Sequence, residues 1–144
     1  MAEITKSKTR VVYRNIHITD LANYRMPASA YVSILHRVSG AIMFLLLPLV
    51  IWLFDNSLSS EISYETFSSA FGAGIGFVPG WFVKLVVLVL IWSYLHHFVA
   101  GVRHLWMDMN HNATDNAGRK SAKATLVISI VLTIALGAKL FSLY

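Results

Sequence analysis

The most chemically distinctive part of the sequence is the polar end of a long apolar segment. Residues 82–92 are almost unbroken in hydrophobic side chains, and three histidines, an arginine and an aspartate follow shortly after them. One set recurs at intervals of four, three and four residues: His97, Gly101, His104 and Asp108. A helix places residues at these intervals in one stripe. At about 1.5 Å per residue, His97 lies about 16 Å along that helix from Asp108.

A histidine this deep in an apolar helix is costly unless a partner compensates its polarity. A hydrogen bond to a neighbouring helix is one explanation, and close helix packing is the matching explanation for Gly101. The whole stripe favours a ligand, because a flat ring could approach the backbone at Gly101 while Arg103 and His104 meet acidic groups at its edge. Haem has this shape, with an iron that takes an imidazole and propionates at one edge. His96 points about 100° away from His97 and is expected to hydrogen-bond a neighbour or face an interface.

A second polar group opens an earlier apolar segment, in the stretch SILHRVSG at residues 33–40. Ser33 and Arg37 are one helical turn apart. His36 is next to Arg37, and Gly40 leaves space nearby. A serine hydroxyl and an arginine suit a carbonyl acceptor such as a quinone, although a lipid head group would fit them as well. For Arg37 alone, snorkelling to the membrane interface is the simpler alternative.

Three segments are long and apolar enough to hold these groups in a membrane. A bilayer core needs about 20 apolar residues of helix, and we expect spans at about 31–54, 81–107 and 122–140. The 144 residues are 56% hydrophobic and only 13% charged, which is far below the charged fraction of an average soluble domain. The absence of cysteine excludes disulfides, thiolate-bound iron–sulfur clusters and cysteine zinc sites within this chain. We therefore expect an all-α membrane protein with three transmembrane helices.

The distribution of Lys and Arg predicts the orientation of these spans. Five basic residues precede the first span, residues 55–80 contain none, and three more lie around the start of the third span. We expect a cytoplasmic N-terminal segment, 1–30, and a membrane-anchor domain, 31–144. This pattern explains the net charge of +5 and excludes nucleic acid as a partner. Since the first span leaves the cytoplasm and the second returns to it, the two polar groups lie at one depth, which favours a shared site.

Two local features modify this plan of three spans. Pro48 is expected to bend or loosen the first span, because proline cannot donate the backbone hydrogen bond of a helix. The loop after that span is rich in Ser and Gly but also holds Ile62, Tyr64, Phe67, Phe71 and Phe77. These are enough to predict a short interfacial helix in the loop.

Two motifs give the chain a resemblance to a known family, the cytochrome b (large) membrane-anchor subunit of bacterial succinate dehydrogenase, respiratory complex II. SILHRVSG opens the first span, and HHFVAGVRHLWMD fits the family's pattern H-x-x-x-G-x-R-H-x-x-x-D. The similarity covers roughly residues 22–140 in order and spacing, including GRKSAK before the third span. The family's R-P-x-S-P-H variant is absent; the chain reads YRMPASAYVSILHR, closer to the proteobacterial form.

The resemblance implies haem b as the cofactor and ubiquinone as the substrate. His97 matches the histidine that supplies one axial ligand to the haem iron, and the second ligand would come from the small membrane-anchor subunit. The x-x-x-G spacing to Gly101 selects His97 over His96 and places both His97 and Gly101 in the cofactor site. Ser33 and Arg37 match ubiquinone-site residues. Three residues are similar to those near the haem propionates: His36, Arg37 and His104.

The resemblance also implies partners and a location. The chain would belong to a hetero-oligomeric helix bundle in the bacterial inner membrane, together with the small membrane-anchor subunit, the iron–sulfur subunit, the flavoprotein subunit and membrane lipids. It would pass electrons from the iron–sulfur subunit to quinone and perform no succinate chemistry itself. The alternatives are a structural anchor without haem, an anchor of the fumarate reductase type, and a self-contained di-haem cytochrome b, which would need deep histidines on more than one span.

Overall fold

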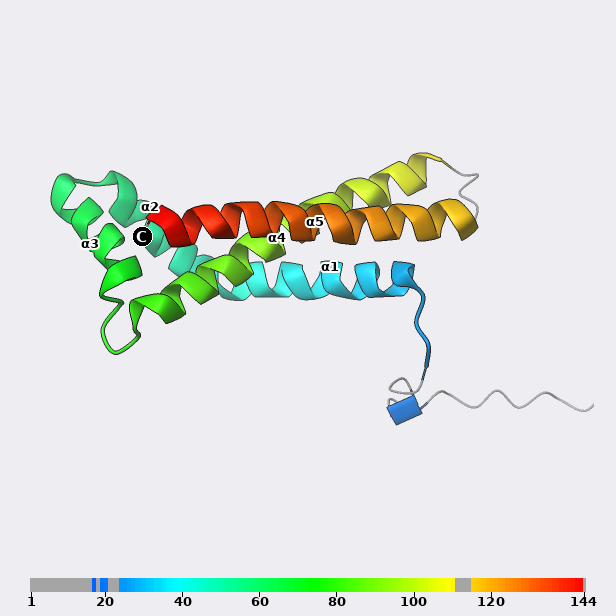
Figure 1. The fold of residues 1–144 in the computed structure, drawn as a ribbon, viewed down its shortest axis with the longest axis horizontal. Helices are drawn as coiled ribbons and strands as arrows, with labels where there is room; N and C mark the ends of the chain where they lie inside the picture. Colours follow the sequence, from blue (N-terminus) through cyan, green and yellow to red (C-terminus); the bar gives the residue numbers. More distant parts are fainter. Residues whose placement is uncertain (1–16, 18, 21–23, 111–114, 144) are drawn as a thin grey trace, which may run out of the picture.

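The computed structural model describes residues 17, 19–20, 24–110 and 115–143, and its architecture is helical (Figure 1). The helices are α1 (Ala28–Leu45), α2 (Leu47–Leu58), α3 (Glu61–Gly72), α4 (Gly80–Met109) and α5 (Asp115–Leu143). Helices α1, α4 and α5 run side by side along the long axis, while α2 and α3 lie together at one end. Within the described ranges, three helical segments are long and apolar enough to cross a membrane: Ala28–Leu45, Gly80–Met109 and Asn116–Leu143. The predicted all-α membrane fold with three spans is confirmed.

The first apolar segment is divided at Leu46, whereas the sequence predicted one span over residues 31–54. Helix α1 ends at Leu45, and α2 begins at Leu47, with Pro48 in its first turn. Proline has no N–H for the helix ladder, and its ring clashes with the carbonyl four residues earlier, so the break follows from Pro48. The 18 residues of α1 give a length of about 27 Å, slightly less than the hydrocarbon core of a bilayer. The break therefore comes close to the end of a crossing.

The helices also extend beyond the apolar segments that predicted them. Helix α5 begins at Asp115, whereas its apolar run was predicted to start at residue 122. Hydropathy marks only the part of a helix that contacts lipid, while the Lys, Arg and Ala residues before it are good helix formers in their own right. The loop before α4 contains a helix, α3, which Ser60 caps by accepting a hydrogen bond from the Ser63 backbone N–H.

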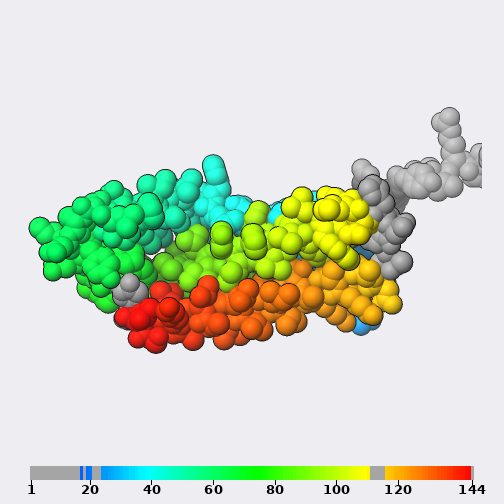
Figure 2. All heavy atoms as spheres, turned by 90° about the horizontal axis from the view of Figure 1, so that it is seen from above, coloured from blue at the N-terminus to red at the C-terminus, as the bar shows by residue number. Residues whose placement is uncertain are grey.

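Small and polar residues fill the contacts between the long helices. One buried cluster takes a residue from each of α1, α4 and α5: Val32, Ala100 and Ala122. Three serines at these contacts are fully buried: Ser39, Ser93 and Ser129. Small side chains allow membrane helices to approach closely, which is a main source of their association. Helices α4 (green to yellow) and α5 (orange to red) accordingly lie against each other in Figure 2.

Candidate functional site

Three histidines from two helices meet between α1 and α4. The rings of His36 and His97 are stacked, with centroids 4.0 Å apart and planes inclined by 15°. The ring of His104 meets that of His36 edge-on, with centroids 5.2 Å apart. All three side chains are half-buried. The structure thus brings together two motifs that are far apart in the sequence, SILHRVSG and HHFVAGVRHLWMD. Their three rings form one histidine cluster made of His36, His97 and His104.

The ring of His97 is held by the backbone of α1. Its Nδ1 lies 3.0 Å from the carbonyl oxygen of His36. The hydroxyl of Ser39 donates to the same carbonyl over 2.9 Å and lies 3.4 Å from Nδ1 of His97. A carbonyl can only accept, so this network assigns the proton of His97 to Nδ1 and leaves Nε2 with a free lone pair. Metal-bound histidines use this arrangement, in which a backbone carbonyl fixes the tautomer and the ring orientation.

Gly40 provides the space in which the His97 ring lies. A Cβ atom at residue 40 would be 3.0 Å from Cε1 and 3.3 Å from Nδ1 of His97. Both distances are shorter than an ordinary van der Waals contact. The absence of a side chain at this position therefore lets α1 approach α4 where the histidine is placed.

We predict that Gly40→Ala destabilises the protein by about 1–3 kcal/mol, because the new methyl group overpacks the ring of His97. This loss exceeds the gain in helix propensity, which is up to about 1 kcal/mol. The measurement is the midpoint of thermal unfolding of the purified protein in detergent. Gly118→Ala is the matched control, since a Cβ at residue 118 meets nothing within 4 Å. A Gly40→Ala variant as stable as the Gly118→Ala variant would contradict the packing role of Gly40.

Gly101 has a different neighbour from the one predicted. A Cβ atom there would lie 3.7 Å from Nε2 of His36, which is an ordinary contact. The ring nearest to the Gly101 backbone is therefore the imidazole of His36. The expectation that a flat ligand approaches the backbone at Gly101 stays a prediction.

His96 lies about 100° around α4 from His97 and faces α5. It is fully buried, its Nδ1 lies 3.2 Å from Oγ of Ser129 on α5, and its ring stacks on that of Trp92 with centroids 5.4 Å apart. The polar atom at 96 thus joins two spans through a hydrogen bond. The two adjacent histidines thus have different hydrogen-bond partners, which are Ser129 on α5 for His96 and the His36 carbonyl on α1 for His97.

Arg103 also faces α5, although the sequence analysis placed it with His104 beside a ligand. Its side chain is 7% exposed, and its guanidinium donates to Oγ of Ser121 over 3.1 Å and to the carbonyl of Gly118 over 3.2 Å. Both partners are on α5, and Asp108 is exposed at the end of α4. Of Arg103 and His104, which were both predicted to meet acidic groups of a ligand, only His104 therefore belongs to the histidine cluster.

Ser33 and Arg37 lie one turn apart on α1, as their spacing requires. Ser33 is half-buried and Arg37 is exposed. Within residues 24–110 and 115–143, no hydrogen bond or ion pair engages either side chain. Both are therefore available to a ligand or to another chain at the surface of the three-helix bundle.

The donor set suits one axial ligand of a haem. The described residues contain no group of three or more His, Asp or Glu side chains that could hold a metal ion. Axial imidazoles of one haem stand on opposite faces of the porphyrin, and the 4.0 Å stack leaves no space for a porphyrin between His36 and His97. A haem on Nε2 of His97 would therefore take its second ligand from outside this cluster.

Two serines that position the histidines, Ser39 and Ser129, were not predicted from the sequence. Ser39 follows His36 by three residues on the same helix face, and this spacing was a signal that the hydroxyl could reach the same site. Ser129 is an isolated serine in the apolar third span, but its partner His96 is 33 residues away. The sequence alone gave no register between the two helices that would have paired them.

Comparisons with known proteins show which family the chain resembles. The family model described as Succinate dehydrogenase/Fumarate reductase transmembrane subunit matches residues 13–136. A succinate dehydrogenase cytochrome b556 subunit from Coxiella burnetii (strain RSA 493 / Nine Mile phase I) is 32% identical over 118 residues, which cover 82% of this chain and 90% of the relative. The subunit of the same name from Paracoccus denitrificans is 26% identical over 111 residues, covering 77% of this chain and 80% of the relative. That from Rickettsia felis (strain ATCC VR-1525 / URRWXCal2) is 23% identical over 133 residues, covering 92% and 98%.

Proposed function

Because the chain belongs to the Succinate dehydrogenase/Fumarate reductase transmembrane subunit family, we propose that it is the haem-binding membrane anchor of a succinate:quinone oxidoreductase. In this role it holds haem b together with the small membrane-anchor subunit and forms part of the site that reduces ubiquinone. It spans the bacterial inner membrane with the start of α1 on the cytoplasmic side. The iron–sulfur and flavoprotein subunits dock on that side, and electrons from succinate reach the quinone through the iron–sulfur subunit.

The hydrogen bond between His97 and the carbonyl of His36 is the observation that carries the haem proposal. It puts the proton on Nδ1, and the lone pair of Nε2 is the donor that we propose for the iron. A b-type haem bound there supplies one-electron transfer. The chain's own task is to hold the imidazole in one orientation, for which it uses the His36 carbonyl, the Ser39 hydroxyl and the space at Gly40.

The other two members of the histidine cluster are proposed to interact with the haem propionates. His36 stacks on His97, and His104 lies one ring further towards the end of α4. Imidazoles can donate hydrogen bonds to carboxylates, and the positively charged Arg37 is next to His36 in the sequence. These groups would compensate the negative charge of propionates inside the membrane.

Ser33 and Arg37 are proposed to bind ubiquinone. The Ser33 hydroxyl and the Arg37 guanidinium can donate hydrogen bonds to a quinone carbonyl, and neither is engaged by another described residue. The positive charge of Arg37 would stabilise the negative charge that develops on the quinone oxygen during reduction. The quinone itself can reach these side chains from the lipid phase.

A structural anchor without haem is the second candidate, and the ring stack supports it. The contact between His36 and His97 joins α1 to α4 directly. In that case the histidines would contribute to helix packing alone. The two candidates differ in whether the assembled protein absorbs visible light.

The test is to purify the chain with its partners through an affinity tag and to add succinate under anaerobic conditions. We expect the absorption bands of a reduced b-type haem and succinate-dependent reduction of ubiquinone. An assembly that reduces ubiquinone with no b-type absorption would establish the structural anchor. An assembly without succinate-dependent reduction of any acceptor would contradict the proposed function as a whole.

A further inference from the structure

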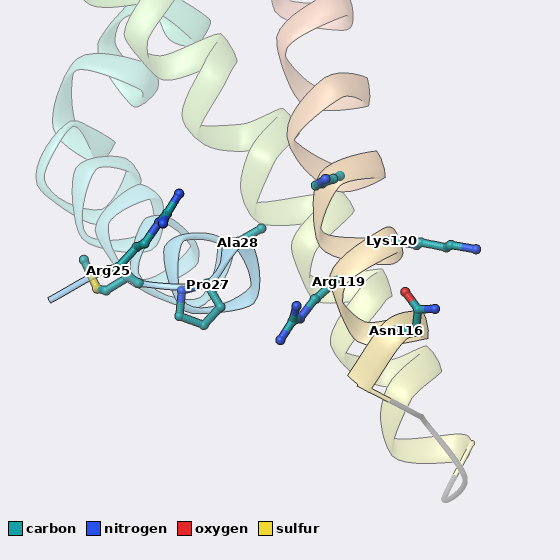
Figure 3. Close-up of a pocket in the computed structure, with 8 residues that line it drawn as sticks. Arg25, Pro27, Ala28, Asn116, Arg119 and Lys120 are labelled. Atoms are coloured by element: carbon teal, nitrogen blue, oxygen red, sulfur yellow. The ribbon is translucent and has the colours of Figure 1, made fainter.

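A cationic cavity lies between the start of α1 and the start of α5, away from the histidine cluster (Figure 3). Its volume is about 630 Å³. Four of its eight lining residues are basic and none is acidic: Arg25, Met26, Pro27, Ala28, Asn116, Arg119, Lys120 and Lys123. The proposed haem and quinone residues do not contribute to this cavity, so it is a separate feature of the chain.

The positive charge of the cavity is not neutralised by the described part of the chain. In Figure 3, the side chain of Arg119 extends from α5 towards Pro27, and Arg25 lies on the other side of that proline. Lys123 follows Arg119 by one helical turn and shares its face. Among the side chains of residues 24–110 and 116–143, none forms an ion pair or a hydrogen bond with these four basic groups.

The N-terminus of α1 adds to the positive electrostatic potential of the cavity. Pro27 is its N-cap, no side chain caps the helix, and its first turn has no acidic residue. The free N–H groups at a helix N-terminus carry partial positive charge and favour an anion nearby. The basic side chains and the helix terminus thus converge on one cavity.

We propose that this cavity binds the phosphate group of an anionic phospholipid. Ala28 and Asn116 are the first residues of two candidate membrane spans, so the cavity lies at the end of the bundle where α1 and α5 begin. Basic side chains at the end of a membrane span are expected at the level of the lipid head groups. Met26, Pro27 and Ala28 give it an apolar side next to the cations. A lipid presents the same combination, since its phosphate is followed directly by glycerol and acyl chains. Basic pockets between membrane helices are the usual sites of such head groups.

An acidic protein segment or free phosphate would fit these features less well. Either would meet the cations but would leave the apolar side of the cavity without a matching group. A lipid also arrives from the bilayer in which the spans lie, so its local concentration is high. We therefore expect selection of phosphatidylglycerol over phosphatidylcholine, which has the same phosphate but no net charge.

The experiment measures lipid binding to the purified complex in phosphatidylcholine nanodiscs to which phosphatidylglycerol is added stepwise. Phosphatidylglycerol should raise the midpoint of thermal unfolding and remain bound in native mass spectra. Arg119→Gln/Lys123→Gln should weaken this binding about thirtyfold, since each basic residue near an anionic lipid surface raises the affinity about fivefold. Arg119→Gln alone should weaken the binding of phosphatidylglycerol about fivefold. This single variant replaces the double variant in the test if the double variant does not assemble. Lys84→Gln/Lys139→Gln is the matched control, because it removes two cations from the other end of the bundle, near the start of α4 and the end of α5.

Three results would overturn the proposal. Equal retention of phosphatidylglycerol by the Arg119→Gln/Lys123→Gln variant and by its control would exclude these cations from a lipid site. An equal rise in the unfolding midpoint with inorganic phosphate alone would assign the cavity to a free anion. Loss of the soluble subunits from the variant, with phosphatidylglycerol retained as in the native chain, would make the cavity a protein docking site.

Discussion

His97→Ala should reduce the haem content of the purified complex at least tenfold, because it removes the proposed axial ligand. The side chain lost is the one whose Nδ1 is bonded to the His36 carbonyl and whose Nε2 is free. A haem that keeps only one axial imidazole from the partner chain would be weakly held. The measurement is the reduced-minus-oxidised spectrum, normalised to the flavin of the same preparation.

His96→Ala is the matched control for this substitution. It removes the same group from the adjacent residue, but His96 is fully buried against Ser129 and Trp92 and does not bond to the His36 carbonyl. We expect a haem content close to that of the native chain, with a lower unfolding midpoint because a buried hydrogen bond is lost. Normal haem in His97→Ala together with lost haem in His96→Ala would transfer the ligand to His96.

Arg37→Leu should slow ubiquinone reduction about a hundredfold, because the proposed charge stabilisation at the quinone oxygen is lost. Succinate oxidation with a soluble dye should stay near the native rate, since that reaction takes place on the other subunits. Leucine keeps much of the volume of the arginine stem, and Arg37 is exposed, so the fold should tolerate the change. Steady-state rates with the two acceptors on the same preparation give the comparison.

Ser33→Ala should have a smaller effect than Arg37→Leu, roughly tenfold or less, because it removes one neutral hydrogen bond. Ser142→Ala and Lys139→Leu are controls on α5 that are exposed and distant from α1. Native ubiquinone turnover in both the Ser33→Ala and the Arg37→Leu variants would remove these residues from the quinone site.

The three spans were predictable because lipid imposes a strong constraint on sequence. A membrane helix needs a long apolar run. The second and third runs form α4 and α5, and the first forms α1 and α2. The break at Leu46 was only partly predictable. Pro48 signals a disturbed helix, but whether the chain bends or starts a new helix depends on where α2 packs against α3, which is a tertiary property.

The histidine cluster was predictable to the level of residue type and helix face. Spacing put His97 and His104 on one face of α4, and the structure brings His36 from α1 to the same place. The orientation of Arg103 was not predictable, because it depends on the rotation of α4 relative to α5. Arg103 and His104 are adjacent in the sequence, yet one bonds to α5 and the other lies in the histidine cluster.

The ligation of haem iron by His97 is the central claim, and a density map of the assembled complex tests it most directly. We predict a porphyrin whose iron is coordinated by Nε2 of His97, while Nδ1 of His97 donates a hydrogen bond to the His36 carbonyl. The second imidazole is supplied by another chain. A map in which the His97 ring packs only against His36 and its protein neighbours, with no porphyrin next to it, would contradict the claim.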